Sequence, residues 1–274
     1  MAVKGDSGML LGEKVAAPTA YAPEVLYPIE RAVGRGNLAQ AALAVMQGVD
    51  VWQAYELSWL DDSGRPFVGL GRFQVPAASA HIIESKSLKL YLNSLNSEQI
   101  GGVGEAIDRI AKDLTAVAGV PVEVAVFPID APGLFPSAVA DYCIDESPLG
   151  EIPAEPLQSN LKTAGEDRVE EVLVSHLLRS LCPVTGQPDW ASVRIDYAGQ
   201  ALDHGALLGY LLGYREHQEF HEQCVERIFC DLYTACAPER LTVQAFYTRR
   251  GGLDINPLRS TEEGAIPGPR HIRQ

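Results

Sequence analysis

"VDVWQAYELSWLDDSGRPFVGLGRFQV", residues 49–75, is the stretch that decides the fold. Its first part, 49–60, is rich in residues that favour strands, and 67–75 has the same character. Between them, "DDSGRP" at 61–66 gathers turn-forming residues. The pattern predicts a strand, a turn and a returning strand.

A helical segment follows this hairpin. In residues 97–119 the apolar side chains recur at intervals of three and four, and Gly119 is the expected C-cap. Residues 120–129 are then predicted to form another strand. The second half repeats this order, with strands at 167–181 and 190–199, two helices within 204–237 that meet near 215–218, and a strand at 239–252 that runs into a Gly-Gly turn.

This order predicts two similar halves rather than alternating strands and helices. Each half has two strands, two helices and a further strand, with one more strand expected, and a proline-containing connection covers 131–162. Strands paired locally, with helices inserted as a block, are typical of the α+β class. We expect an N-terminal domain at 1–150 and a C-terminal domain at 151–274.

The composition narrows the classes of partner. The chain has 36 acidic and 22 basic residues, a formal net charge of -14, whereas nucleic-acid-binding proteins usually present a basic face. A small-molecule partner is therefore expected, and no nucleic acid. Apolar runs fall short of the roughly 18–20 residues that span a bilayer, and residues 1–20 lack the apolar region of a secretory signal. We expect no membrane partner and a cytoplasmic location.

Five cysteines occur, at Cys143, Cys182, Cys224, Cys230 and Cys236. The odd number in a long chain argues against a disulfide framework. There is no CxxC pair, and the spacing of the last three fits no common zinc pattern, so no metal is expected. Buried packing is the default interpretation for the cysteines.

The segment "ESKSLKLYLNSLN", residues 84–96, is unusually polar. Lys86 and Lys89 could bind a phosphate as point charges. Taken alone, the segment is better interpreted as the solvated start of a helix, with Ser85 or Ser87 as its N-cap.

A second segment, "FHEQCVERIFCDL" at 220–232, opens a helix with His221 and Glu222 and places Glu226 on the same face. It is not an HExxH zinc motif, because position 225 is valine. Glu222 could accept two hydrogen bonds from the N–H edge of a guanine or a pterin. The default interpretation of these carboxylates is exposed helix charge.

The third segment, "LRSLCPVTGQPDWA" at 178–191, places Cys182 and Asp189 on one loop stiffened by prolines. A cysteine thiolate can attack an electrophilic carbon, and a nearby carboxyl group can act as proton donor. Without context, a cysteine beside a proline is more often an inert core residue.

Together, these three segments resemble the NADPH-dependent 7-cyano-7-deazaguanine reductases, the nitrile reductases of queuosine biosynthesis, in their longer form. The resemblance runs from "LGEKVAAPTAYAPEVLYPI" (11–29) to "TRRGGLDINPLRS" (248–260), without departure at the key positions. It implies two tandem tunnelling-fold (T-fold) domains, each an antiparallel sheet backed by two helices, and a homodimer.

The resemblance also implies a reaction and a set of residues. The nitrile of 7-cyano-7-deazaguanine is reduced by two NADPH to 7-aminomethyl-7-deazaguanine, after Cys182 forms a covalent thioimide and Asp189 protonates the nitrogen. The sequence contains no GxGxxG fingerprint, so a Rossmann cofactor site is not expected. The implied substrate contacts are Ile83, Glu84, Ser85, His221 and Glu222, and the implied cofactor contacts are Ser85, Lys86, Arg250 and Gly251.

Two other functions remain open at this stage. A pterin-forming cyclohydrolase of the same fold would need a metal to activate water, and a metal assay would distinguish it. A purine- or pterin-binding protein without catalytic activity is the other alternative, and the pair of Cys182 and Asp189 argues against it.

Overall fold

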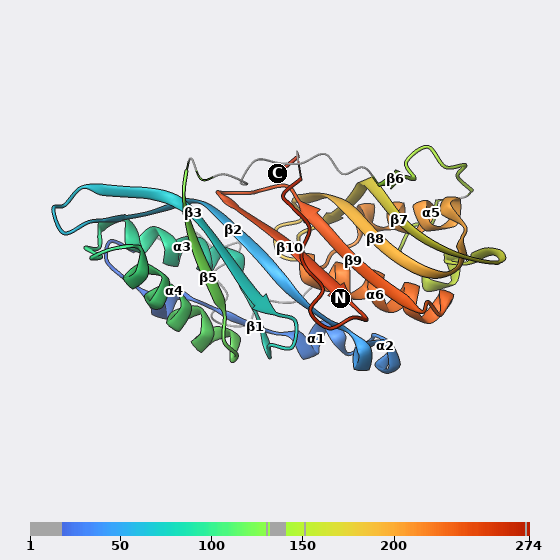
Figure 1. Ribbon diagram of the computed structural model, residues 1–274, viewed down its shortest axis with the longest axis horizontal. Helices are drawn as coiled ribbons and strands as arrows, with labels where there is room; N and C mark the ends of the chain where they lie inside the picture. Colours follow the sequence, from blue (N-terminus) through green and yellow to red (C-terminus); the bar gives the residue numbers. More distant parts are fainter. Residues whose placement is uncertain (1–17, 130, 132–140, 151, 272) are drawn as a thin grey trace. The chain divides into compact units, whose positions relative to one another are not determined.

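The computed structural model describes residues 18–129, 131, 141–150, 152–271 and 273–274 (Figure 1). It divides into two compact units. The first comprises Met1–Val33, Asp50–Phe135 and Arg249–Ile255, and the second Gly34–Val49, Pro136–Thr248 and Asn256–Gln274. The units thus interleave along the chain, whereas the predicted domains were contiguous halves. The predicted 131–162 connection lies partly outside the described residues.

The first unit is built on the hairpin that opened the sequence analysis. β2 (Gln47–Leu60) and β3 (Pro66–Pro76) are neighbours, and β3 pairs antiparallel with β5 (Glu123–Pro128). The backbone turns at Asp61, whose N–H donates to Arg65 O at 2.9 Å. Two helices, α3 (Ser85–Ser94) and α4 (Val103–Ala118), lie on one face of these strands (Figure 1).

The apolar side chains of α4 pack into the core of the first unit. α4 presents Ile110, Leu114 and Ala118, all fully buried, to the apolar faces of β2 and β3, and Gly119 caps it as predicted. The helix begins at Val103, later than the predicted start at residue 97. The shorter elements are η1 (Pro23–Val25), β1 (Pro28–Glu30), β4 (His81–Ile83) and η2 (Leu95–Ser97), and β1 pairs antiparallel with β4.

The second unit has the strand order β10-β9-β8-β7-β6. All these neighbours are antiparallel except β6 and β7, which are parallel. As predicted, two helices follow the β7–β8 hairpin, and they cover one face of the strands (Figure 1). The bounds are β6 (Tyr142–Cys143), β7 (Thr163–Leu181), β8 (Pro188–Leu202), β9 (Arg240–Tyr247), β10 (Leu253–Ser260), α5 (His204–Leu212), α6 (His221–Cys236), α2 (Gln40–Val45), η3 (Gln158–Asn160) and η4 (Gly213–Glu216).

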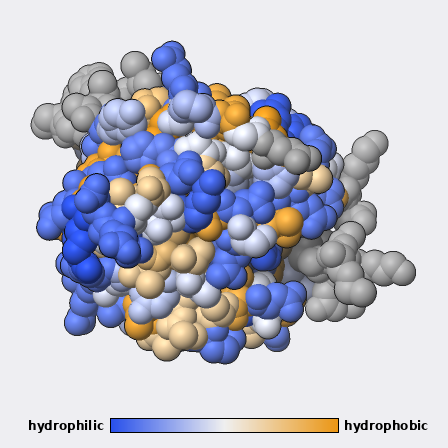
Figure 2. Space-filling view, turned by 90° about the vertical axis from the view of Figure 1, so that its right-hand side faces the viewer, coloured by the Kyte–Doolittle hydropathy of each residue, from blue (hydrophilic) through white to orange (hydrophobic). Residues whose placement is uncertain are grey.

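The predicted α+β class is therefore confirmed, with sheets that are mostly antiparallel. Every helix in the described part of the chain is too short or too polar to cross a membrane. Hydrophilic residues cover much of the face in Figure 2, and hydrophobic patches interrupt them, as expected for a net charge of -14.

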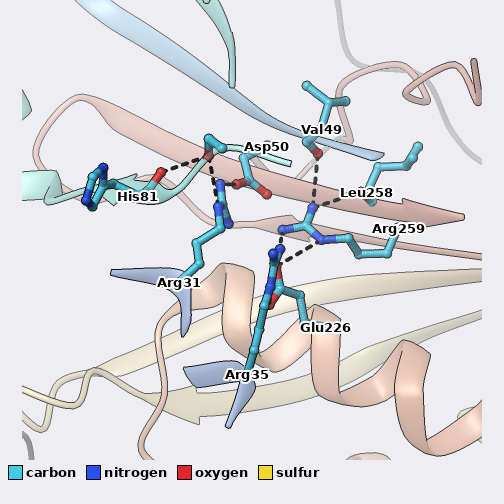
Figure 3. Close-up of polar contacts among 9 residues, drawn as sticks. Arg31, Arg35, Val49, Asp50, His81, Glu226, Leu258 and Arg259 are labelled. Carbon is cyan, nitrogen blue, oxygen red and sulfur yellow. Dashed lines mark hydrogen bonds and ion pairs between the residues drawn. The ribbon is translucent and has the colours of Figure 1, made fainter. Parts of the chain in front are cut away.

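Buried ion pairs lie in both units, at the ends of helix α1 (Arg31–Arg35) (Figure 3). In the first unit, Arg31 pairs with Asp50. In the second, the Glu226 carboxylate accepts hydrogen bonds from Arg35 at 2.7 and 2.9 Å and from Arg259 at 2.9 and 3.3 Å. The default interpretation of Glu226 as an exposed helix charge is wrong, because these two arginines cover it.

Candidate active site

The β7–β8 hairpin carries the two residues that sequence motifs singled out as nucleophile and acid. Asp189 is paired across the strands with Ser180. Cys182 opens the connecting loop, where its N–H donates to Gln187 O at 2.9 Å and its carbonyl accepts from the Gly186 N–H at 2.9 Å. Gly186 has a φ of 66°, a left-handed conformation that glycine adopts without strain. The loop is thus a tight, internally bonded turn.

Strand geometry places the side chains of Ser180 and Asp189 on one face of the hairpin. Residues directly opposite on antiparallel strands share a face. Cys182 follows the last residue of β7. Asp189 is 5 % exposed and Cys182 is 4 % exposed, while the adjacent Trp190 is 37 % exposed. The thiol and the carboxylate at this end of the hairpin are therefore both buried.

The first residue of α6 contacts this face. His221 Nε2 lies 3.3 Å from Asp189 Oδ2, and the imidazole stacks on the Tyr247 ring with centroids 3.7 Å apart and planes 4° apart. Tyr247 is held opposite Ala191, which is two residues from Asp189 and so shares its face. Nδ1 of His221 is buried and makes no hydrogen bond within the described residues. The imidazole is therefore fixed against the acid, with one nitrogen available to a bound molecule.

A second thiol lies nearby but is unsuited to attack. Cys224 is fully buried. Burial raises the pKa of the Cys224 thiol, so it stays protonated at neutral pH. Cys230 and Cys236 are also buried, as predicted, and this leaves Cys182 as the thiol at the end of the hairpin.

Glu222 follows His221 in the first turn of α6 and is 1 % exposed. The default interpretation of an exposed charge is wrong here too. Glu222 follows the histidine that contacts Asp189, so its carboxylate lies in the same part of the second unit.

In the first unit, Glu84 is the N-cap of α3 in place of the predicted Ser85 or Ser87. Its carboxylate accepts the N–H groups of Lys86 and Ser87, both at 2.7 Å. Burial raises the pKa of Glu84, although these two hydrogen bonds and the nearby lysines lower it in part. Ile83 ends β4 and is buried, whereas Ser85 and Lys86 are partly exposed at the start of the helix.

The predicted Gly-Gly turn lies beside α3. The Arg250 N–H donates to Leu253 O at 2.9 Å, and Gly251 and Gly252 have φ values of 58° and 76°, as in the tight hairpin turn that two such residues form. A Cβ atom at Gly251 would lie 3.3 Å from Cε of Lys89, so the lysine stem passes directly over the turn.

A pocket of about 270 Å³ opens between this turn, α3 and β2. Gly251 lines it, while Ser85, Lys86 and Arg250 are outside its lining. Lys89, which is not among the implied cofactor contacts, also lines it. The lining residues are Ala54, Glu56, Lys89, Leu90, Leu92, Asn93, Asn96, Gly251, Gly252 and Leu253.

The predicted site residues thus form two clusters. The second unit brings together Cys182, Asp189, His221 and Glu222. The first unit contains Ile83, Glu84, Ser85 and Lys86 at α3, and Arg250 and Gly251 at the turn. Sequence reasoning missed Tyr247, because strand alternation gives the face of an aromatic residue but not its stacking partner. It also missed Glu56, which is a strand residue in no motif.

Comparisons with known proteins indicate the family of the chain. A family described as "Nitrile reductase, 7-cyano-7-deazaguanine-reductase N-term" matches residues 17–126, and one described as "QueF-like protein" matches residues 188–265. Proteins named NADPH-dependent 7-cyano-7-deazaguanine reductase are similar over nearly the whole chain. The one from Bordetella pertussis is 49 % identical over 258 residues, covering 94 % of each chain. Those from Dechloromonas aromatica and Desulfotalea psychrophila are 48 % identical over 267 residues, covering 96 % of this chain and 94 % of the relative, and 46 % identical over 271 residues, covering 98 % of each.

Identity at this level over more than nine-tenths of the chain decides the family. The segments that carry Glu84 and Asp189 fall inside the two matched regions. The chain belongs to the family of NADPH-dependent 7-cyano-7-deazaguanine reductases.

Proposed function

We propose that this enzyme reduces the nitrile of 7-cyano-7-deazaguanine to 7-aminomethyl-7-deazaguanine with two NADPH, in queuosine biosynthesis. The observation that carries the proposal is the end of the β7–β8 hairpin, where the thiol of Cys182 and the carboxyl group of Asp189 are both buried. His221 Nε2 lies 3.3 Å from Asp189 Oδ2.

The first chemical step is addition of the thiol across the carbon–nitrogen triple bond. The sulfur of Cys182 bonds to the nitrile carbon, one π bond breaks, and the thiol proton ends on the nitrogen, delivered by Asp189. The product is a covalent thioimide, which accepts a hydride more readily than a nitrile does. His221 keeps the Asp189 carboxyl oriented and can share its proton during the transfer.

Loss of the thiol allows the second reduction. Bound NADPH would supply the two hydrides, one for the thioimide carbon and, after exchange, one for the imine. Between the two, the carbon–sulfur bond breaks and Cys182 regains its proton. Two carbon–hydrogen bonds are formed in all, and the nitrile nitrogen becomes the primary amine of the product. The chain's own part is to hold the carbon at Cys182 and to move protons through Asp189.

The residues of the first unit fit the phosphates of NADPH. Lys86, Lys89 and Arg250 supply cations, and the turn at Gly251 offers backbone without a side chain beside a pocket of about 270 Å³. We assign Ser85, Lys86, Arg250 and Gly251 to cofactor binding, with Arg250 and Lys86 at the 2′-phosphate. Arg250→Ala should raise the KM for NADPH more than that for NADH, and an equal effect on both would contradict the assignment.

The substrate is assigned to Glu222 and His221, with Ile83, Glu84 and Ser85 as further contacts. The buried Glu222 carboxylate would accept the N–H edge of the deazaguanine, and the free Nδ1 of His221 suits a second polar contact. A site that hydrogen-bonds a purine edge rejects analogues without it, because its own buried groups would then stay unpaired. Glu222→Gln should therefore raise the KM for the substrate more than it lowers kcat.

We further propose that each half of the chain is a tunnelling-fold domain, that the protein is a homodimer, and that it acts in the cytoplasm without a nucleic-acid partner. The strands backed by two helices in each unit support the first of these proposals.

Mass spectrometry with 7-cyano-7-deazaguanine tests the mechanism. Without NADPH, the wild type should gain the mass of one substrate on the Cys182 peptide. Cys182→Ala should form no adduct and oxidise no NADPH, and Asp189→Ala should lose turnover while it keeps its melting temperature. A matched Cys230→Ala variant should keep the adduct. If the wild type forms no adduct and oxidises no NADPH, the reductase proposal fails.

A further inference from the structure

Cys143 departs from the other cysteines. The default interpretation placed it in the core, but it is exposed, whereas Cys182, Cys224, Cys230 and Cys236 are buried. It ends β6, the short parallel strand beside β7, where it is paired with Val174. Packing in the core therefore does not explain a cysteine at this position. The side chains around it indicate another role.

Two further metal-binding side chains, Asp145 and His176, converge on this thiol. Ligand atoms of Cys143, Asp145 and His176 all lie within 4.8 Å of one another. In tetrahedral zinc sites with sulfur and nitrogen ligands, ligand atoms are about 3.5 Å apart, so a small rotation of the exposed cysteine side chain closes the site.

The fold holds the other two ligands in place. A register shift in β7 between Ser175 and Leu178 interrupts its pairing with β8. Asp145 Oδ1 accepts a hydrogen bond from Ser175 Oγ at 2.7 Å, and the His176 N–H lies 3.1 Å from Oδ2. Irregularities of this kind often redirect a side chain at a functional site. The carboxylate is thus anchored beside the histidine it would share an ion with.

His176 has the support that metal-binding histidines usually have. Its Nδ1 lies 2.9 Å from Ser192 Oγ, which fixes the ring and leaves Nε2 as the nitrogen for an ion. Such a hydrogen bond on the second nitrogen is typical of imidazole ligands. The buried His271 ring has its centroid 5.2 Å from that of His176, so it or a water can occupy a fourth position.

We propose that Cys143, Asp145 and His176 bind one zinc ion, which clips the segment at 143–145 to the irregular part of β7. Thiolate, imidazole and carboxylate together suit zinc, whereas magnesium and calcium prefer oxygen ligands alone. On binding, the thiol proton passes to solvent and a sulfur–zinc bond forms. The sequence predicted no metal, because these ligands come from segments 31 residues apart and fit no linear motif. The role is structural and uses none of the proposed catalytic residues.

Zinc titration of the full chain tests the proposal. Chelator-treated protein is titrated with zinc against a chromophoric competitor, and metal content is measured after desalting. We expect one zinc per chain, with Cys143→Ser and His176→Ala each weakening affinity by about tenfold or more. Cys182→Ala and His81→Ala are the matched controls and should bind as the wild type does. Thermal melts with and without zinc should show stabilisation in the wild type and controls only.

Cobalt substitution identifies the sulfur ligand directly. Bound cobalt should give a thiolate-to-metal charge-transfer band that Cys143→Ser loses and Cys182→Ala keeps. Less than one retained zinc per chain would overturn the proposal, as would zinc that is lost in Cys182→Ala but kept in Cys143→Ser. Neither assay depends on turnover, so failure here is distinct from failure of the reductase proposal.

Discussion

Replacing Glu226 by glutamine tests whether the buried ion pairs stabilise the second unit (Figure 3). The Glu226 side chain is 2 % exposed and accepts hydrogen bonds from Arg35 and from Arg259, which is 0 % exposed. Glutamine keeps the size and one acceptor oxygen but removes the negative charge. The buried guanidinium of Arg259 would then lose the negative charge of the carboxylate that it contacts at 2.9 Å.

The structure sets the expected magnitude. Removing one partner of a buried ion pair costs about 3–5 kcal/mol. Here the loss should be at the lower end, about 3 kcal/mol, because Arg35 is 23 % exposed and can be hydrated, and because glutamine keeps a hydrogen bond. At roughly 2–4 °C per kcal/mol for a domain of this size, the melting temperature should fall by about 6–12 °C.

Calorimetry and urea unfolding provide the assay, with Glu105→Gln as the matched control. Glu105 is paired with Arg109 at 2.8 Å on the exposed side of α4, where such a pair contributes about 0.3–0.5 kcal/mol. If Glu226→Gln lowers the melting temperature no more than Glu105→Gln does, the buried pairs do not stabilise the unit and the reasoning is refuted.

Two other changes have defined outcomes. Gly252→Ala should destabilise the protein more than Gly64→Ala: both have φ near 80°, where a side chain costs about 1–2 kcal/mol, but only at Gly252 would the new Cβ meet a carboxylate carbon at 2.6 Å. If both variants lose the same free energy of unfolding, the turn beside the pocket can adjust to the new side chain and the prediction is wrong. Burial raises the pKa of Glu219, but the contact with His217 at 3.1 Å and the hydrogen bonds from Arg227 outweigh this and lower the pKa below 4.5. Its stabilising contribution is therefore present above pH 4.5 and lost as the pH falls through the lower folded pKa, so Glu219→Gln should reduce the acid dependence of stability between pH 3 and 5. If Glu219→Gln leaves the loss of stability between pH 5 and 3 unchanged, the prediction is wrong.

The parts of the fold that were predicted correctly share a strong local signal. The hairpin at 49–75 and the helices within 204–237 are long enough for alternation or helical spacing to show. The helices α1 and α2, by contrast, have five and six residues, less than two turns each, and so carry no readable period. β7 begins at Thr163 rather than 167, because its first residues are mostly polar and exposed.

The residues of the candidate site also differ in whether they could be recognised from the sequence. Cys182 and Asp189 could be singled out because they lie close together in one short segment with prolines, although the structure places Asp189 in β8 and not in the loop that was predicted. The cap made by Glu84 could not, since a glutamate in the sequence ESKS looks like an ordinary helix charge until its carboxylate is seen to accept two backbone N–H groups. The burial of Glu226 depends on Arg35 and Arg259, which lie 191 and 33 residues away. Long-range partners of this kind leave no mark within a motif.

Strand register connects the fold to the proposed chemistry. In a strand, a slip of one residue turns every side chain to the opposite face. Such a slip in the β7–β8 hairpin would exchange Asp189 for the exposed Trp190 and separate the acid from His221. Two features oppose it: the tight turn closed by hydrogen bonds at Cys182, and the pairing of Ala191 with Tyr247, whose ring stacks on the same histidine. The position of the acid relative to the thiol is thus set by the same hydrogen-bond ladder that builds the sheet, and the prolines flanking the loop restrict its freedom further.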